Sequence, residues 1–349
     1  MMKKLSILLP LLQLLLCASC MRDVVLKLDP VSPMLVLNAS ITPDREVAAF
    51  LSKSWFLLDS VPEYDLSDEK VILNVYVNDV FQGNMQRSDN PVDSTECKGQ
   101  YKLPGCYVKS GDKIKLEAEV PGFDPVEAKT IIPQKKEIIS LDTTFFPNTR
   151  KLQMYITLQD TPSEHNYYRL LVERLLEFHK GDSVMWISEF CDDDWIRSSV
   201  SGDRFNVDYL YFHHFSLNYD DLVFQPDIPS LDNYKGVSYR GIFSDELFNG
   251  KEYAVACSLT PDNSFVTDTL SLTVHYDIHL LSISEDYYKY LKVIRNFSIS
   301  LGDANMGGML EPTATYSNVT DGFGVVTGYQ KSTRRITMPI GEAPPYYGW

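Results

Sequence analysis

The sequence predicts a mainly β protein of two domains, and three observations support this prediction. Residues 113–120, KIKLEAEV, alternate polar and apolar side chains without a break, as in a strand with one buried face. Short β-rich runs separated by turn residues recur between residue 24 and about residue 140, which is typical of a β-sandwich. The chain has 349 residues, more than one hydrophobic core usually serves.

The first domain is expected to span residues 20–140. Its clearest strands are residues 35–41 (LVLNASI), 71–78 (VILNVYVN) and 113–120. A polar stretch that begins with a proline, residues 133–137, follows the strand pattern EAKTII and marks the expected end of this domain. The boundary could lie as far along as Pro147-Asn148.

A second, mostly β domain is expected over residues 146–349. It shows further β-rich runs, and a short strand is expected near its end; the ranges are 151–160, 166–178, 207–215, 251–259, 270–283 and 324–329. Long connections such as 216–236 exceed a simple hairpin turn. They are either functional loops or local additions to the fold.

One helix is predicted, at about residues 285–298. Ser284 is a good N-cap, and Glu285 and Asp286 place negative charge in the first turn. The following YYKYLKVIRNF has apolar side chains spaced for one helix face, and Gly302 is suited to end the helix.

The chain begins with a secretory signal peptide, residues 1–19. Lys3 and Lys4 precede an apolar run at residues 5–16 that is too short to span a bilayer. Small residues then lead to Cys20, as in bacterial lipoprotein signals, where the cysteine receives a lipid. Lipidation of Cys20 would anchor the protein by its acyl chains. The alternative is ordinary cleavage near Ala18-Ser19, which leaves Cys20 as a free thiol.

The charge argues against a nucleic-acid partner. The net charge of −15 becomes −17 when residues 1–19, which include two lysines, are removed. Phosphate binding needs clustered lysine and arginine, which an acidic chain of this kind lacks. The same charge repels anionic membrane surfaces, so the lipid would have to hold the protein at a membrane.

Four cysteines follow Cys20. Cys97 and Cys106 flank CKGQYKLPGC, whose glycines and proline suit a tight hairpin, so a local disulfide is one prediction and two unpaired small residues are the other. Cys191 and Cys257 are too far apart in sequence to argue a pairing.

Metal binding finds little support. Asp192, Asp193 and Asp194 could ligate calcium, but consecutive acids lack the alternating spacing of an EF-hand loop and are more often a solvated loop. His213 and His214 are expected on opposite faces of a strand.

His275 and His279 would suit zinc on a helix. On the strand that their period-two surroundings predict, they lie about 13 Å apart, too far to share an ion, and are expected at the surface or half-buried. The sequence contains no G-x-S-x-G, no H-E-x-x-H, no phosphate-binding glycine loop and no dinucleotide fingerprint. We therefore expect no cofactor and no catalytic residues.

Several longer stretches resemble one family. They are GDKIKLEAEVPGFDPVEAKTIIP at 111–133, NYYRLLVER at 166–174, FSDELFNGKEY at 243–253, SEDYYKYLKVI at 284–294 and LEPTATYSNVTDGFGVVTGY at 310–329. Together with the lipoprotein start, they resemble the Bacteroidota outer-membrane lipoproteins grouped as domain of unknown function 4249. Met306-Gly-Gly-Met309 departs from the family pattern.

The resemblance implies an immunoglobulin-like or prealbumin-like N-terminal sandwich and an outer-membrane setting. It also implies a TonB-dependent transporter as partner, because relatives tend to be encoded beside such transporters. The family has no assigned catalytic residues. Arg22-Asp23 loosely resembles the charged tag that sends such lipoproteins to the cell surface. The triplet Asp-(Ser/Thr)-apolar or Thr, used for O-glycosylation in that phylum, occurs at Ser60, Ser94, Thr143, Ser183 and Thr269.

The leading hypothesis is a non-catalytic, lipid-anchored accessory or ligand-capture protein that works with a TonB-dependent transporter; its ligand is not specified by the sequence. An adhesion or extracellular binding module is the second hypothesis. The third is a glycosidase-like hydrolase built from loops 192–206 and 216–236, with the carboxylates of Asp192, Asp193, Asp194, Asp220 and Asp221.

Overall fold

The structure, a computed structural model, confirms a mainly β protein. It describes residues 32–55, 65–66, 69–88, 99–149, 151–162, 164–192, 195–203, 217–224, 241–260, 271–303 and 316–339. In this part of the chain, strands form three sheets, and the one α-helix is α2 (Glu285–Asp303), as predicted near the C-terminal end. A short 3-10 helix, η1, covers Leu222–Phe224.

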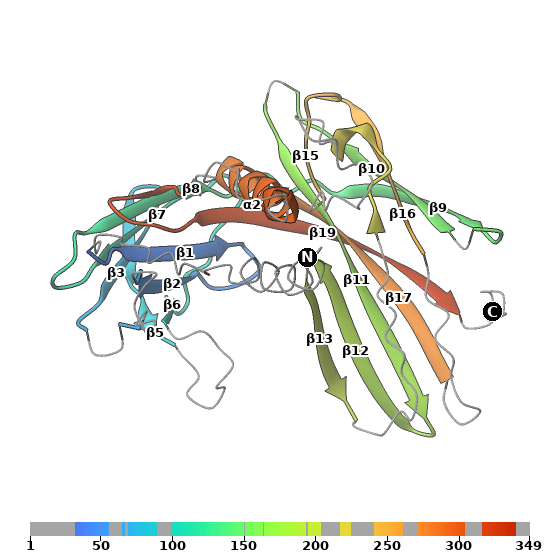
Figure 1. The fold of residues 1–349 in the computed structure, drawn as a ribbon, viewed down its shortest axis with the longest axis horizontal. Helices are drawn as coiled ribbons and strands as arrows, with labels where there is room; N and C mark the ends of the chain where they lie inside the picture. The colour runs from blue at the N-terminus through green and yellow to red at the C-terminus, as the bar shows by residue number, and fades with distance from the viewer. Residues whose placement is uncertain are drawn as a thin grey trace, which may run out of the picture.

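The largest sheet has ten strands and runs through the whole molecule (Figure 1). Its order is β13 (Trp195–Gly202), β12 (Ser183–Asp192), β11 (Tyr167–Lys180), β17 (Ser271–Ile283), β19 (Val326–Pro339), β1 (Leu35–Ile41), β2 (Ala48–Lys53), β6 (Gln100–Lys102) and β5 (Gln86–Arg87), with β15 (Ile242–Ser244) also pairing with β11.

A five-stranded sheet packs against the end of the large sheet that contains β1 and β2. Its order is β18 (Val319–Thr320), β8 (Val126–Ile131), β7 (Lys113–Glu119), β3 (Ile72–Val77) and β4 (Val80–Asn84). The two layers share one core, in which Leu37 and Leu51 of the large sheet meet Val75 and Leu116 of the smaller one. We call this pair of layers the first sandwich; its immunoglobulin-like or prealbumin-like class stays a prediction.

A four-stranded sheet covers the other end of the large sheet, in the order β14 (Leu217–Asn218), β16 (Glu252–Leu259), β10 (Lys151–Gln159) and β9 (Ile138–Phe146). Met154 and Ile156 of this sheet share a core with Leu170 and Ile278 of β11 and β17. We call this pair of layers the second sandwich.

Strand β19 belongs to both sandwiches. It pairs in parallel with β1 from Val326 to Gly328 and then antiparallel with β17 from Tyr329 to Pro339. Val319 and Val326 lie in the core of the first sandwich, although the sequence places them in the domain of residues 146–349. A C-terminal segment therefore completes the N-terminal sandwich, and the division into domains 20–140 and 146–349 stays a prediction.

Most predicted strands lie within one or two residues of their expected ends. Residues 113–120 correspond to β7, where Ile114, Leu116 and Ala118 are buried and the intervening side chains are more exposed. The run 207–215 lies outside the described residues. The short strand expected at 324–329 is wrong in length, since β19 continues through the polar stretch that ends at Pro339.

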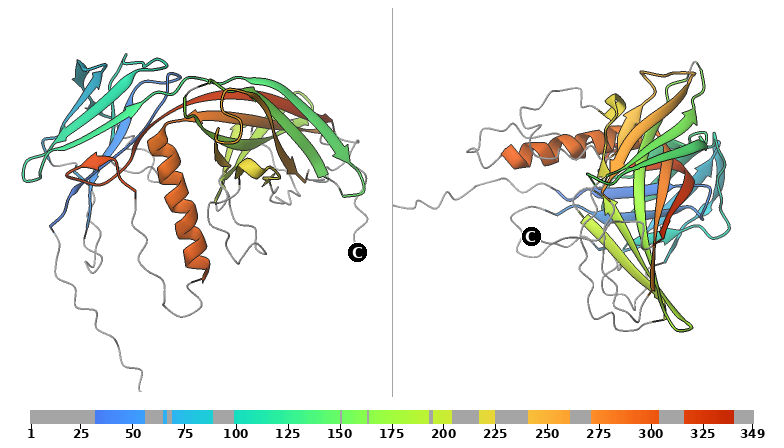
Figure 2. Two further views of the ribbon diagram at one scale, coloured as in Figure 1. Left: turned by 90° about the horizontal axis from the view of Figure 1, so that it is seen from above. Right: turned by 90° about the vertical axis from the view of Figure 1, so that its right-hand side faces the viewer.

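Helix α2 stands out from the sheets, with its first turns against them (Figure 2). Leu291 is buried against Leu171, Leu281 and Ile283 of the large sheet. The helix runs to Asp303, past the predicted end near residue 298. Among the described residues, no helix is both long and apolar enough to cross a bilayer.

Candidate functional site

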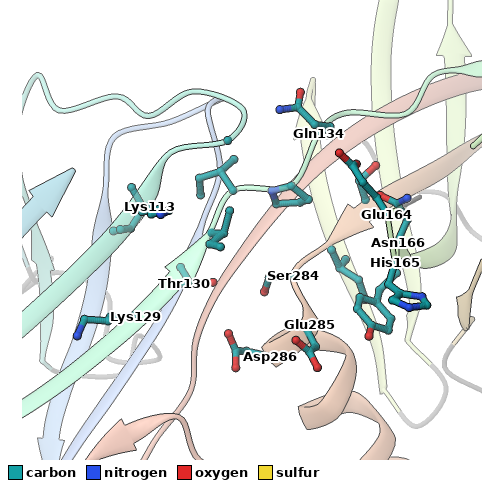
Figure 3. Close-up of a pocket in the computed structure, with 18 of the residues that line it drawn as sticks. Lys113, Lys129, Thr130, Gln134, Glu164, His165, Asn166, Ser284, Glu285 and Asp286 are labelled. Carbon is teal, nitrogen blue, oxygen red and sulfur yellow. The ribbon is translucent and has the colours of Figure 1, made fainter. Parts of the chain in front are cut away.

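A pocket of about 790 Å³ lies where the two sandwiches meet (Figure 3). Strands β7 and β8 of the first sandwich form one wall, residues 164–167 and the start of α2 form the other, and Pro133-Gln134 lies between them. We call it the junction pocket. Its volume is in the range of small-molecule sites, roughly 300–1,000 Å³.

The first wall carries lysines on an apolar base. Lys129 and Lys115 hold their ammonium groups 2.5 Å from the carboxylates of Glu127 and Glu117, respectively. Lys113 is exposed, and its backbone N–H donates to Asn78 Oδ1 at 3.0 Å. The two isoleucines Ile131 and Ile132 complete this wall, so it combines positive charge with apolar surface.

A buried hydroxyl also lines the first wall. Thr130 is 3 % exposed, and its Oγ1 has no hydrogen-bond partner among the described residues. An unpaired buried hydroxyl is costly, typically about 1–3 kcal/mol. Thr130 shares the buried face of β8 with Val126 and Ala128, whereas Lys129 and Ile131 lie on the opposite, exposed face.

Two buried aspartates hold the second wall. Asp245 Oδ2 accepts a hydrogen bond from the backbone N–H of Asn166 at 2.8 Å. Asp160 accepts from the Tyr168 hydroxyl at 2.5 Å and from the Gly250 N–H at 2.8 Å. Burial and the neighbouring Asp160 carboxylate raise the pKa of the Tyr168 phenol well above its usual value, so Tyr168 keeps its proton as donor. These bonds fix the backbone that presents Glu164 and His165.

The N-terminus of α2 is held at the same wall. Ser284 is the predicted N-cap, and its Oγ accepts from the Tyr287 N–H at 3.4 Å and from the Gly328 N–H at 3.2 Å. Asp286 accepts a hydrogen bond from the Tyr316 hydroxyl at 2.5 Å, and Glu285 lies 2.8 Å from Lys289. The acids of the first turn are thus engaged within the protein.

The junction between the sandwiches is tied to β19 by side-chain hydrogen bonds. Gln330 donates to the Ser110 hydroxyl at 2.6 Å and to the carbonyl oxygen of Pro133. Ser332 Oγ accepts from the Ile138 N–H at 3.0 Å and donates to Glu137 at 2.7 Å. Residues 133–137, where the first domain is predicted to end, and the adjoining Ile138 are therefore held to β19 by hydrogen bonds.

The zinc candidates His275 and His279 lie on strand β17, as predicted. The prediction that they lie at the surface or half-buried is wrong, because both are buried. His275 is 8 % exposed and bonds Thr337 Oγ1 through Nδ1 at 2.9 Å and Glu177 through Nε2 at 3.0 Å. His279 repeats the arrangement with Thr333 at 2.8 Å and Glu173 at 3.2 Å. Burial is possible because each ring nitrogen has a partner, and no metal-ligand cluster occurs among the described residues.

Three of the five carboxylates in the hydrolase hypothesis belong to the described residues, Asp192 in the large sheet and Asp220 and Asp221 after β14 of the four-stranded sheet. Asp192 ends β12 of the large sheet, and the expected loop after it is mostly strand β13; Asp193 and Asp194 lie outside the described residues. Asp221 follows β14 and accepts hydrogen bonds from the Tyr253 hydroxyl at 2.7 Å and the Ala256 N–H at 3.0 Å. Asp220 lies 3.2 Å from Lys151. Asp220 and Asp221 thus anchor their loop on the second sandwich.

The remaining predicted sites are only partly described. Cys257 is a buried free thiol and Cys106 is half-buried, whereas Cys97 lies outside the described residues, so the Cys97–Cys106 disulfide stays a prediction. Thr143 is exposed on β9 and Ser183 is half-buried at the start of β12. Outside the described residues lie the predicted signal peptide, Cys20, His213, His214, Ser60, Ser94 and Thr269.

Sequence reasoning missed the junction pocket. Its wall residues Lys113 and Glu164 come from segments 51 positions apart, and Ser284 from a third segment. No motif links them, because the three segments come together only in the folded chain.

A family model for domain of unknown function 4249 matches residues 22–335. The chain belongs to this family. The match covers the two sandwiches, α2 and most of β19 of this DUF4249 protein, so the resemblance read from the sequence is confirmed. A search of curated proteins finds no significant match.

Proposed function

We propose that this DUF4249 protein is a lipid-anchored ligand-capture protein of the outer membrane that works with a TonB-dependent transporter. The observation that carries the proposal is the junction pocket, which is of small-molecule size and whose surroundings are held by the hydrogen bonds of Gln330 and Ser332. A pocket that is fixed before the ligand arrives suits capture, because little conformational freedom is lost on binding.

The membrane part of the proposal rests on the N-terminus. The lysines, the apolar run and the small residue before Cys20 are the features that a lipoprotein signal requires. Arg22-Asp23 supports display on the cell surface, where an anchored protein can meet ligands before a transporter does. A TonB-dependent transporter is proposed as the partner because members of the family tend to be encoded beside such transporters.

Two results would test the anchor. Growth with a labelled fatty acid should label the wild-type chain, and a Cys20→Ala variant should lose both the label and the membrane fraction. A Cys106→Ala variant is the matched control and should keep both. Equal labelling of the Cys20→Ala variant and wild type would refute lipidation at Cys20.

The partnership calls for co-purification. The tagged protein, solubilised from its native membranes in mild detergent, should bring down a TonB-dependent transporter at a defined stoichiometry. Protease treatment of intact cells should remove the protein if it is displayed on the surface. Recovery of the protein without any transporter under several mild detergents would refute the partnership.

A further inference from the structure

We propose that the junction pocket takes a short peptide with both termini charged, its carboxylate near Lys113 and its ammonium near Glu164. This inference rests on the proposed function of the pocket as a ligand site and specifies the ligand class. The two residues lie on opposite walls, Lys113 on β7 and Glu164 on the loop before β11 (Figure 3).

The charges in the pocket divide into engaged and available groups. Lys129 forms an ion pair with Glu127, and Asp286 accepts a hydrogen bond from the Tyr316 hydroxyl. Lys115 and Glu285 are likewise paired. The charged ends of Lys113 and Glu164 have no hydrogen bond or ion pair with the rest of the described chain, and both residues are exposed.

A ligand with charges of both signs matches this arrangement. A dianion would face the Glu164 carboxylate and a dication would face Lys113, whereas a neutral sugar can hydrogen-bond to both groups but neutralises neither charge. Asp79, in the turn beside Lys113, is a second available carboxylate, so the first wall does not favour purely anionic ligands.

The space between the two charges suits a peptide. Ile131, Tyr167 and Pro133 supply apolar surface for side chains. A single amino acid would leave most of the 790 Å³ unfilled, whereas a few residues occupy it.

The test uses four pools of tripeptides with varied side chains, which differ only in their ends: both free, N-acetylated, C-amidated, or both blocked. Retention by the mature lipoprotein in detergent micelles is read by native mass spectrometry. We expect the free pool to be retained at least about tenfold more than the doubly blocked pool, as for charge-assisted hydrogen bonds. Equal retention of these pools, or retention of none, would overturn the peptide assignment.

Two variants test which residue binds each end of the peptide. Lys113→Met should weaken only peptides with a free carboxylate, and Glu164→Gln only those with a free ammonium. Lys151→Met, which removes a paired lysine outside the pocket, should change neither. A larger effect of Lys129→Met than of Lys113→Met, or of Asp79→Asn than of Glu164→Gln, would overturn the assignment.

Failure of this inference can be told apart from failure of the proposed function. If no tripeptide pool is retained but a transporter co-purifies and a natural ligand of another class occupies the wild-type pocket, only the peptide class is wrong. If neither transporter nor ligand is recovered, the proposed function fails as well.

Discussion

Gly324, just before β19, is the position where one added methyl group should disrupt the strand shared by the two sandwiches. Its φ is +119°, and a Cβ there would lie 2.0 Å from the carbonyl oxygen of Leu37 on β1. A side chain at positive φ costs about 1–2 kcal/mol. The overlap would also disturb the hydrogen bonds Leu37 N–H to Phe323 O, 2.8 Å, and Ala39 N–H to Val325 O, 3.0 Å. Each is worth about 0.5–1.5 kcal/mol, so Gly324→Ala should lower the free energy of unfolding by about 2–5 kcal/mol.

Gly122→Ala is the matched control. Its φ of +87° gives similar backbone strain, but an added Cβ meets no atom within 4 Å, so only about 1–2 kcal/mol should be lost. Urea unfolding followed by tryptophan fluorescence compares the two variants with the wild type. Equal losses of free energy in the two variants would refute the steric role of Gly324 at the junction.

Three further predictions concern buried polar groups. Arg174→Met leaves the buried Glu189 without its arginine and should lower the free energy of unfolding by about 3–5 kcal/mol in urea. Burial, and then the positive charge of Lys331, lowers the pKa of His279 in the folded protein. As pH falls, the unfolded chain therefore binds a proton at this histidine before the folded chain does, and the free energy of unfolding should decrease below pH about 6.5. This decrease should be less steep in His279→Gln. Burial raises the pKa of the Cys257 thiol, which should resist maleimide in the native protein and react once unfolded, as peptide mass spectrometry can show.

Each has a control and a contrary result. Arg335→Met breaks the more exposed pair with Asp277 and should cost at most about 1 kcal/mol; a cost equal to that of Arg174→Met would contradict the burial argument. His165→Gln changes an exposed histidine and should leave the acid-induced loss of stability intact. Native labelling of Cys257 as fast as that of a small thiol would contradict its burial.

Local patterns were sufficient for much of the fold. The alternation of residues 113–120 predicts β7 because one face of that strand enters the core of the first sandwich. The helix α2 is predicted from Ser284, two acids and an apolar face, and the structure has each of them in the expected role.

The end of the chain shows why the rest could not be predicted. From Gln330 to Arg335, β19 is wholly polar. Its side chains form hydrogen bonds with residues 110, 133, 137 and 138, which lie where the two sandwiches meet. A strand of this composition has no apolar period, so it reads as a loop. The parallel pairing of β1 with β19 joins residues nearly 290 positions apart, which no local pattern encodes.

The same cause hides the candidate site. Lys113 and Glu164 are ordinary surface residues in their own segments, and they lie on opposite walls of one pocket only where the two sandwiches meet. The Glu–His–Thr pairings around the two buried histidines likewise need three strands, β11, β17 and β19, from distant parts of the chain.

The most direct test of ligand capture in the junction pocket is native mass spectrometry of the protein purified from its own cells. Ile131 is 53 % exposed and lines the pocket, so Ile131→Trp should fill the pocket without disturbing the core. We predict that the wild-type protein carries a small molecule that is released on unfolding, and that Ile131→Trp carries much less of it. The same bound mass in both proteins, or none in either, would contradict the account.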